Sequence, residues 1–104
     1  MSIIKSVVQE EYQRLQALYK KYIDKIDSYP KGTVSIKKRN NGEYLYLANR
    51  QHGKVKFNYI GSVVSEKAQK IIELIKIRKS YEQKLKQVKS DLSEIGKVLN
   101  GKKI

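Results

Sequence analysis

The spacing of apolar residues changes twice along this chain of 104 residues, from a helical period to a strand period and back. Over residues 3–27 the apolar side chains recur every three or four positions, the seam of a helix that packs against another helix. This seam consists of Val8, Tyr12, Leu15, Tyr19, Tyr22 and Ile26. Pro30 disfavours a helical conformation in Tyr29 before it, so the first predicted helix ends at about that point.

A second heptad pattern predicts a helix over residues 65–99, with Ser65 as its N-cap. Arg78 interrupts an otherwise apolar seam of Ile71, Leu74, Tyr81, Leu85, Val88, Leu92, Ile95 and Leu99. Helices with matching seams are expected to pack antiparallel when a compact segment joins them. The second predicted helix is longer than the first, so its last turns need another surface to pack against. A homodimer through the helices is therefore expected. Residues 100–104 are expected to form a frayed tail.

Residues 33–61 instead alternate apolar and polar side chains, which is the period of a β-strand. Asn41-Gly42 and Gln51-His52-Gly53 are typical turn sequences, and they divide the segment into three strands of an antiparallel meander. The sequence therefore predicts one α+β domain over residues 1–104. Its helices form an antiparallel, coiled-coil-like pair that the three-stranded sheet caps.

The lengths of the two turns decide which strand residues share a face of the sheet. A two-residue loop at 41–42 and a three-residue loop at 51–53, with Gly53 left-handed, give one apolar face: Val34, Ile36, Leu45, Leu47, Val55, Phe57 and Tyr59. The other face then carries Lys37, Arg39, Tyr44, Tyr46, Lys54, Lys56 and Asn58. Exchanging the loop lengths would turn Tyr44 and Tyr46 inward and expose Leu45 and Leu47. Five residues are core in both registers: Val34, Ile36, Val55, Phe57 and Tyr59. We favour the first register because it separates apolar from cationic residues.

The formal net charge of +13 indicates an anionic partner, which could be nucleic acid, a membrane surface or an acidic protein. Residues 1–30 carry five basic and four acidic side chains, residues 31–61 seven and one, and residues 62–104 eleven and five. A face that only needs to be solvated would mix charges of both signs. A membrane-bound helix would need an apolar face that the seam already occupies, so no membrane partner is expected.

The candidate nucleic-acid-binding residues lie in the meander: Lys37, Lys38, Arg39, Tyr44, Tyr46, Arg50, Lys54 and Lys56. A β-ribbon can enter the major groove of duplex DNA, and exposed tyrosines can instead stack on unpaired bases. The alternative without a ligand is a solvated face whose lysines protect edge strands from pairing. We favour a non-enzymatic protein that binds nucleic acid, with duplex DNA as the expected form. The alternative function is a protein-interaction module, such as a phage-encoded inhibitor of a host effector or a subunit of a helical bundle.

No catalytic, metal or cofactor site is expected. The chain has no cysteine, and its single histidine, His52, lies in a predicted turn. The acidic residues are scattered over helix faces, where surface ion pairs such as Glu10 with Arg14 explain them. No glycine-rich phosphate loop is present. The chain also lacks a signal peptide pattern and a membrane-spanning apolar stretch, so a cytoplasmic location is expected.

The stretch Gly32–Gly61, GTVSIKKRNNGEYLYLANRQHGKVKFNYIG, followed by SEKAQKIIELI, resembles the arm-binding domain of phage-type tyrosine recombinases. The resemblance covers about half of the chain and rests on the basic first strand, the N-G turn, the aromatic second strand and the G-K-V-K third strand. It implies a sheet inserted into the major groove, in a protein of a phage or mobile element. The residues it implicates are Lys37, Arg39, Tyr44, Tyr46 and Lys56.

The chain departs from that family because its last helix is a long heptad helix, whereas the family's helix is short and leads into a catalytic domain. Over its whole length the chain is similar to small uncharacterised bacterial and phage proteins that share the order helix, Tyr-rich meander, long helix. That second resemblance implies no function.

Overall fold

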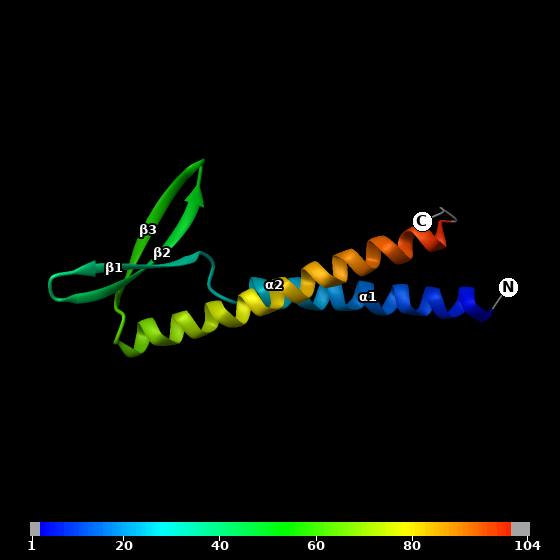
Figure 1. The fold of residues 1–104 in the computed structure, drawn as a ribbon, viewed down its shortest axis with the longest axis horizontal. Coiled ribbons are helices and arrows are strands. Elements are labelled where there is room, and N and C mark those ends of the chain that lie inside the picture. The colour runs from blue at the N-terminus through cyan, green and yellow to red at the C-terminus, as the bar shows by residue number, and fades with distance from the viewer. Residues whose placement is uncertain (1–2, 101–104) are drawn as a thin grey trace. The chain divides into compact units, whose positions relative to one another are not determined.

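The computed structural model of the protein describes residues 3–100 and contains two helices and a three-stranded antiparallel sheet (Figure 1). The elements are α1 (Ile3–Asp27), β1 (Thr33–Arg39), β2 (Gly42–Gln51), β3 (Lys54–Ser62) and α2 (Glu66–Leu99). The predicted α+β class and the order helix, meander, helix are confirmed. Residues 101–104 of the expected tail lie outside the described residues.

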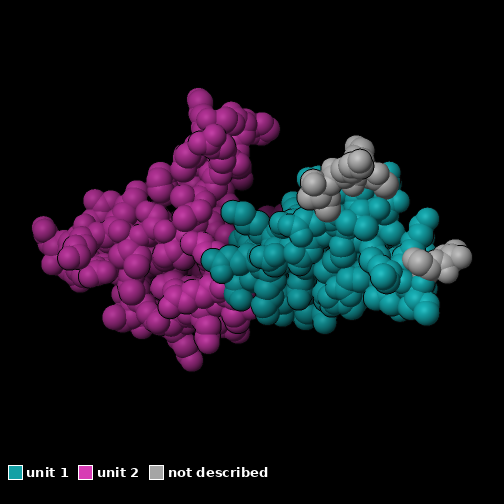
Figure 2. Space-filling view, turned by 45° about the vertical axis from the view of Figure 1, so that its right-hand side comes forward, with its two compact units in different colours: residues 1–26, 80–104 teal, residues 27–79 magenta. Residues whose placement is uncertain are grey.

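The chain divides into two compact units (Figure 2). The helical unit comprises residues 1–26 and 80–104, so it combines most of α1 with the second part of α2. The sheet unit comprises residues 27–79 and combines the meander with the first part of α2.

The helical unit is an antiparallel pair joined along the predicted seams (Figure 1). Leu15 of α1 and Val88 of α2 are buried, and the other seam positions of α1 are half-buried. The rings of Tyr22 and Tyr81 meet across the pair with centroids 5.8 Å apart. The tyrosines at heptad positions therefore serve as helix–helix core residues.

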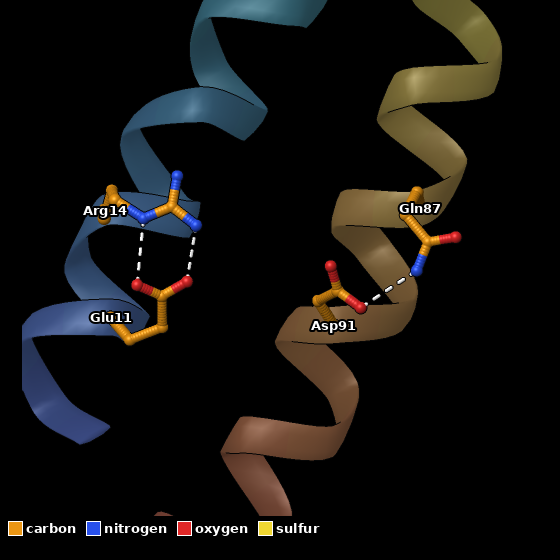
Figure 3. Close-up of polar contacts among 4 residues, drawn as sticks. All are labelled: Glu11, Arg14, Gln87 and Asp91. Atoms are coloured by element: carbon orange, nitrogen blue, oxygen red, sulfur yellow. Dashed lines mark hydrogen bonds and ion pairs between the residues drawn. The ribbon is translucent and has the colours of Figure 1, made fainter. Parts of the chain in front are cut away.

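Polar contacts within each helix flank this seam (Figure 3). Arg14 donates two hydrogen bonds to the carboxylate of Glu11, one of them from Nε to Oε2 at 2.9 Å, and Gln87 Nε2 donates to Asp91 Oδ1 at 3.0 Å. The expected partner of Arg14, Glu10, is thus replaced by the acid one position later. The hydrogen bond from Arg14 lowers the pKa of the Glu11 carboxyl, but solvent screens so exposed a pair.

The buried residues of the sheet unit lie on β2 and on the first part of α2. Strand order β1-β2-β3 makes β2 the central strand, and its Leu45 and Leu47 are buried. On α2 the buried residues of this unit include Ala68 and Ile75. The Ala68 N–H donates to Ser65 Oγ at 3.2 Å, which confirms the predicted N-cap.

Arg78, which interrupts the seam of α2, has a structural role in the sheet unit. Its side chain is 9 % exposed, and its two terminal nitrogens donate to the carbonyls of Pro30 at 2.6 Å and Gly32 at 2.8 Å. Gly32 has a φ of 109°, and a Cβ there would lie 2.9 Å from Asn49 Oδ1. One guanidinium therefore fixes the tight backbone that leads into β1 against α2.

The first turn keeps the predicted length but lies one residue earlier than predicted. Arg39 pairs with Gly42, so the loop is Asn40-Asn41 rather than Asn41-Gly42. Each β1 residue therefore pairs two positions earlier along β2 than expected, and its side chain keeps the same face. As the favoured register predicted, Leu45 and Leu47 are buried and Tyr44 and Tyr46 lie on the opposite face. Ile36 is on the core face, but on an edge strand it is 47 % exposed, so its predicted burial is wrong.

The second turn has two residues, His52-Gly53, where three were predicted. Gln51 pairs with Lys54, and His52 and Gly53 have φ values of 52° and 78°. Two consecutive left-handed residues make a type I′ turn, whose twist matches that of the flanking strands. Histidine is among the residues that adopt this conformation most readily after glycine.

The shorter turn places every side chain of the first part of β3 on the face opposite to the prediction. Val55, Phe57 and Tyr59 share the face of Tyr44 and Tyr46, so their assignment to the core is wrong. Lys54, Lys56 and Asn58 lie instead on the face of Leu47, which corrects their predicted place beside the tyrosines. They remain exposed because the tip of the β2–β3 hairpin extends beyond the region that α2 covers (Figure 1). A β-bulge between Leu45 and Tyr46 then moves Leu45 opposite Gly61.

We predict that Arg78→Leu lowers the free energy of unfolding by about 2 kcal/mol, because two backbone carbonyls lose a charged donor. Urea unfolding followed by circular dichroism measures the change, with Lys79→Leu at the exposed neighbouring position as the control. A more stable Arg78→Leu variant would show that an uninterrupted apolar seam matters more than these hydrogen bonds.

Candidate nucleic-acid interface

The exposed face of the sheet gathers aromatic and basic side chains from all three strands. Alternation along each strand and the observed pairing place these residues on one side, which we call the aromatic face: Lys37, Arg39, Tyr44, Tyr46, Arg50, Val55, Phe57 and Tyr59. An antiparallel sheet with one wet face usually carries polar side chains there. Here the middle of that face carries four aromatic rings.

The tyrosine rings form a connected group. Tyr46 and Tyr59 are cross-strand partners, with ring centroids 5.3 Å apart and planes inclined at 60°. The ring centroids of Tyr44 and Tyr59 are 6.3 Å apart, and their ring planes are inclined at 46°. These tilted and edge-on geometries are favourable for aromatic pairs and leave ring surface open to solvent. Tyr59 is 59 % exposed and Phe57 49 % exposed, so the group is a surface rather than a core.

Lys37 links the two edge strands across β2. Its Nζ lies 4.2 Å from the ring centroid of Phe57 and 4.7 Å from that of Tyr46. An ammonium at these distances is attracted by the negative ring faces. The contact holds a positive charge directly over the aromatic face.

An open groove of about 620 Å³ lies at the end of this face next to the first turn. It is lined by Lys38, Arg39, Asn40, Asn41, Tyr44, Tyr46 and Tyr59. The groove thus offers cations for phosphate, side-chain amides for hydrogen bonding and rings for stacking.

Five of the eight predicted site residues lie together on the aromatic face: Lys37, Arg39, Tyr44, Tyr46 and Arg50. Lys38 points to the other side by alternation but lines the groove. Lys54 and Lys56 are not part of this face. Sequence reasoning missed Phe57 and Tyr59, and the signal that finds them is the His52-Gly53 pair, read as a two-residue hairpin loop.

Residues 3–100 contain no group of three or more His, Cys, Asp or Glu side chains placed to hold a metal ion. Within the same range, neither helix combines the length and apolar character needed to cross a membrane.

One protein-family model matches residues 4–70, and its description is Domain of unknown function (DUF6788). The match spans nearly all of α1, the whole sheet and the start of α2, so it includes every residue of the aromatic face. No curated protein and no solved structure matches the chain.

We predict that the Hε protons of Lys37 resonate upfield of those of the other lysines in the proton NMR spectrum, because the adjacent Nζ lies over the rings of Tyr46 and Phe57. Phe57→Leu should shift them back toward the ordinary position, whereas Ile36→Leu, on the opposite face, should not. An ordinary chemical shift for Lys37 in the unsubstituted protein would contradict the orientation of β3.

Proposed function

The chain belongs to the DUF6788 family of domains of unknown function, and from its surface chemistry we propose that it binds nucleic acid and catalyses no reaction. The observation that carries the proposal is the aromatic face, where exposed rings and basic side chains lie side by side. Contiguous exposed apolar surface with a polar rim is typical of a binding site.

The charge of the chain supports an anionic ligand. The protein carries a formal charge of +13, and the aromatic face holds Lys37, Arg39 and Arg50 without an acidic side chain. Lysine and arginine on a nucleic-acid interface contact phosphates and release condensed counterions, which supplies sequence-independent affinity.

A cytoplasmic location fits this proposal, since nucleic acid is present there and the chain has no cysteine. A role in a phage or mobile element rests on the resemblance to arm-binding domains alone.

We predict that Lys37→Glu combined with Arg39→Glu lowers the affinity for nucleic acid at least tenfold at about 50 mM salt and reduces the salt slope by about two. Fluorescence anisotropy with a salt titration measures both quantities. The control is Lys20→Glu combined with Lys21→Glu, which makes the same charge change on α1.

Two results would reject the proposal. Absence of binding by the unsubstituted protein at low salt would remove nucleic acid as the ligand. Equal losses in both double variants would show attraction to overall charge and no role for the sheet. Circular dichroism checks that each variant is folded.

We also propose that the helical unit self-associates into a homodimer. Ile3, Ile4 and Val7 of α1 are 83 %, 76 % and 57 % exposed, and Val98 of α2 is 50 % exposed. The start of α1 and the end of α2, which carry these residues, lie at the same end of the helical unit (Figure 1). A second copy of the chain would bury these side chains in an isologous, four-helix contact.

We predict a light-scattering mass of twice the chain mass for the unsubstituted protein, and of one chain for Ile4→Glu combined with Val7→Glu. Charge at these positions would have to be buried unpaired in the dimer. A monomeric mass for the unsubstituted protein at high concentration would contradict the dimer.

A further inference from the structure

We infer that the aromatic face is a base-stacking surface for single-stranded nucleic acid, an inference that rests on the nucleic-acid proposal and narrows it. The rings of Tyr44, Tyr46, Phe57 and Tyr59 would contact the faces of unpaired bases. The basic side chains of the face would contact the phosphates: Lys37, whose Nζ lies over the rings of Phe57 and Tyr46, together with Arg39 and Arg50.

The orientation of β3 is the first support. It brings Phe57 and Tyr59 to the face that already carries Tyr44 and Tyr46, so aromatic rings from two neighbouring strands form one surface. Rings two residues apart on a strand are about 7 Å apart, and neighbouring strands about 4.8 Å apart. Successive ring positions can thus each accept a base, and stacking contributes about 1 to 3 kcal/mol per base whatever its identity.

The same orientation argues against a major-groove ribbon. A ribbon in the major groove needs side chains that hydrogen bond to base edges and enough cations to follow both backbones. The middle of this face carries rings together with Ala48 and Val55, and Lys54 and Lys56 lie on the other side. Paired bases keep their faces stacked on each other inside the duplex, so exposed rings find no partner there. Unpaired bases present those faces.

The groove beside the first turn fits the end of such a strand. Its three tyrosines also belong to the aromatic face. The other lining residues are the cations Lys38 and Arg39 and the side-chain amides of Asn40 and Asn41. A base held against the tyrosines would have hydrogen-bonding groups within the same groove, and its phosphate would lie near the two cations. Single-stranded DNA and RNA share the chemistry that this arrangement recognises, since neither ring stacking nor phosphate contact depends on the 2′-hydroxyl.

The test compares labelled oligonucleotides of about 12 nucleotides, as single-stranded DNA, single-stranded RNA and the DNA duplex of the same sequence, by fluorescence anisotropy with salt titration. The proteins are the unsubstituted full chain, Tyr46→Leu, Tyr59→Leu, the conservative Tyr46→Phe, and Ile36→Ala on the opposite face. Urea unfolding checks the stability of each variant.

We expect at least one single-stranded oligonucleotide to bind about tenfold or more tighter than the duplex, since the duplex hides its base faces. Tyr46→Leu and Tyr59→Leu should each lower single-strand affinity about 5- to 100-fold with an unchanged salt slope. Tyr46→Phe and Ile36→Ala should bind like the unsubstituted protein. Comparison of the affinities for the DNA and RNA strands shows which of the two the protein prefers.

The outcomes that overturn the inference differ from those that overturn the proposed function. If the duplex binds as tightly as the single strands and the leucine variants bind normally, stacking is wrong while nucleic-acid binding stands. If polyglutamate of equal charge displaces the labelled strand as well as unlabelled oligonucleotide does, the surface recognises charge alone and both the stacking and the nucleic-acid assignment fall. If no oligonucleotide binds at low salt, the proposed function itself is wrong.

Discussion

The two-residue turn at His52 and Gly53 determines which side of the sheet the aromatic residues of β3 occupy. With both residues left-handed, Tyr59 pairs with Tyr46, and Phe57 comes within reach of Lys37. One additional residue in this turn would move those rings to the opposite face of the sheet, the face of Leu47. The composition of the aromatic face therefore depends on this local backbone conformation.

The opposite side of the sheet is held by few residues. Leu45 and Leu47 are buried on β2, Ala68 and Ile75 on α2, and Arg78 fixes the backbone that enters β1. Because this core is small, the hydrogen bonds that the buried Arg78 guanidinium donates to the carbonyls of Pro30 and Gly32 help to position β1 against α2. The exposed rings are therefore carried by a sheet whose inner side is anchored at its centre, while the hairpin tip extends beyond the part that α2 covers.

The helices and the burial of β2 could be predicted from the sequence because hydrophobic spacing reports them directly. Leu45 and Leu47 alternate with Tyr44 and Tyr46, and Pro30 follows shortly after the end of α1. The side of the sheet on which each β3 side chain lies could not be predicted. Gln51-His52-Gly53 is compatible with turns of two or three residues, and the two-residue turn depends on a positive φ at His52. The hydrogen-bond partners of Arg78 could not be predicted from the sequence either, because they lie 46 and 48 positions away in the chain. Two of the eight proposed contact residues, Lys54 and Lys56, were misplaced for the first of these reasons.

Photochemical crosslinking can show whether unpaired bases contact the aromatic face. A single-stranded oligonucleotide with 5-iodouracil at each position in turn would be irradiated with the full-length protein, and the crosslinked peptides identified by mass spectrometry. Base stacking on the aromatic face predicts crosslinks at Tyr44, Tyr46, Phe57 or Tyr59. Crosslinks confined to the opposite face, at Lys54 and Lys56, or to the lysines of α2 would contradict it.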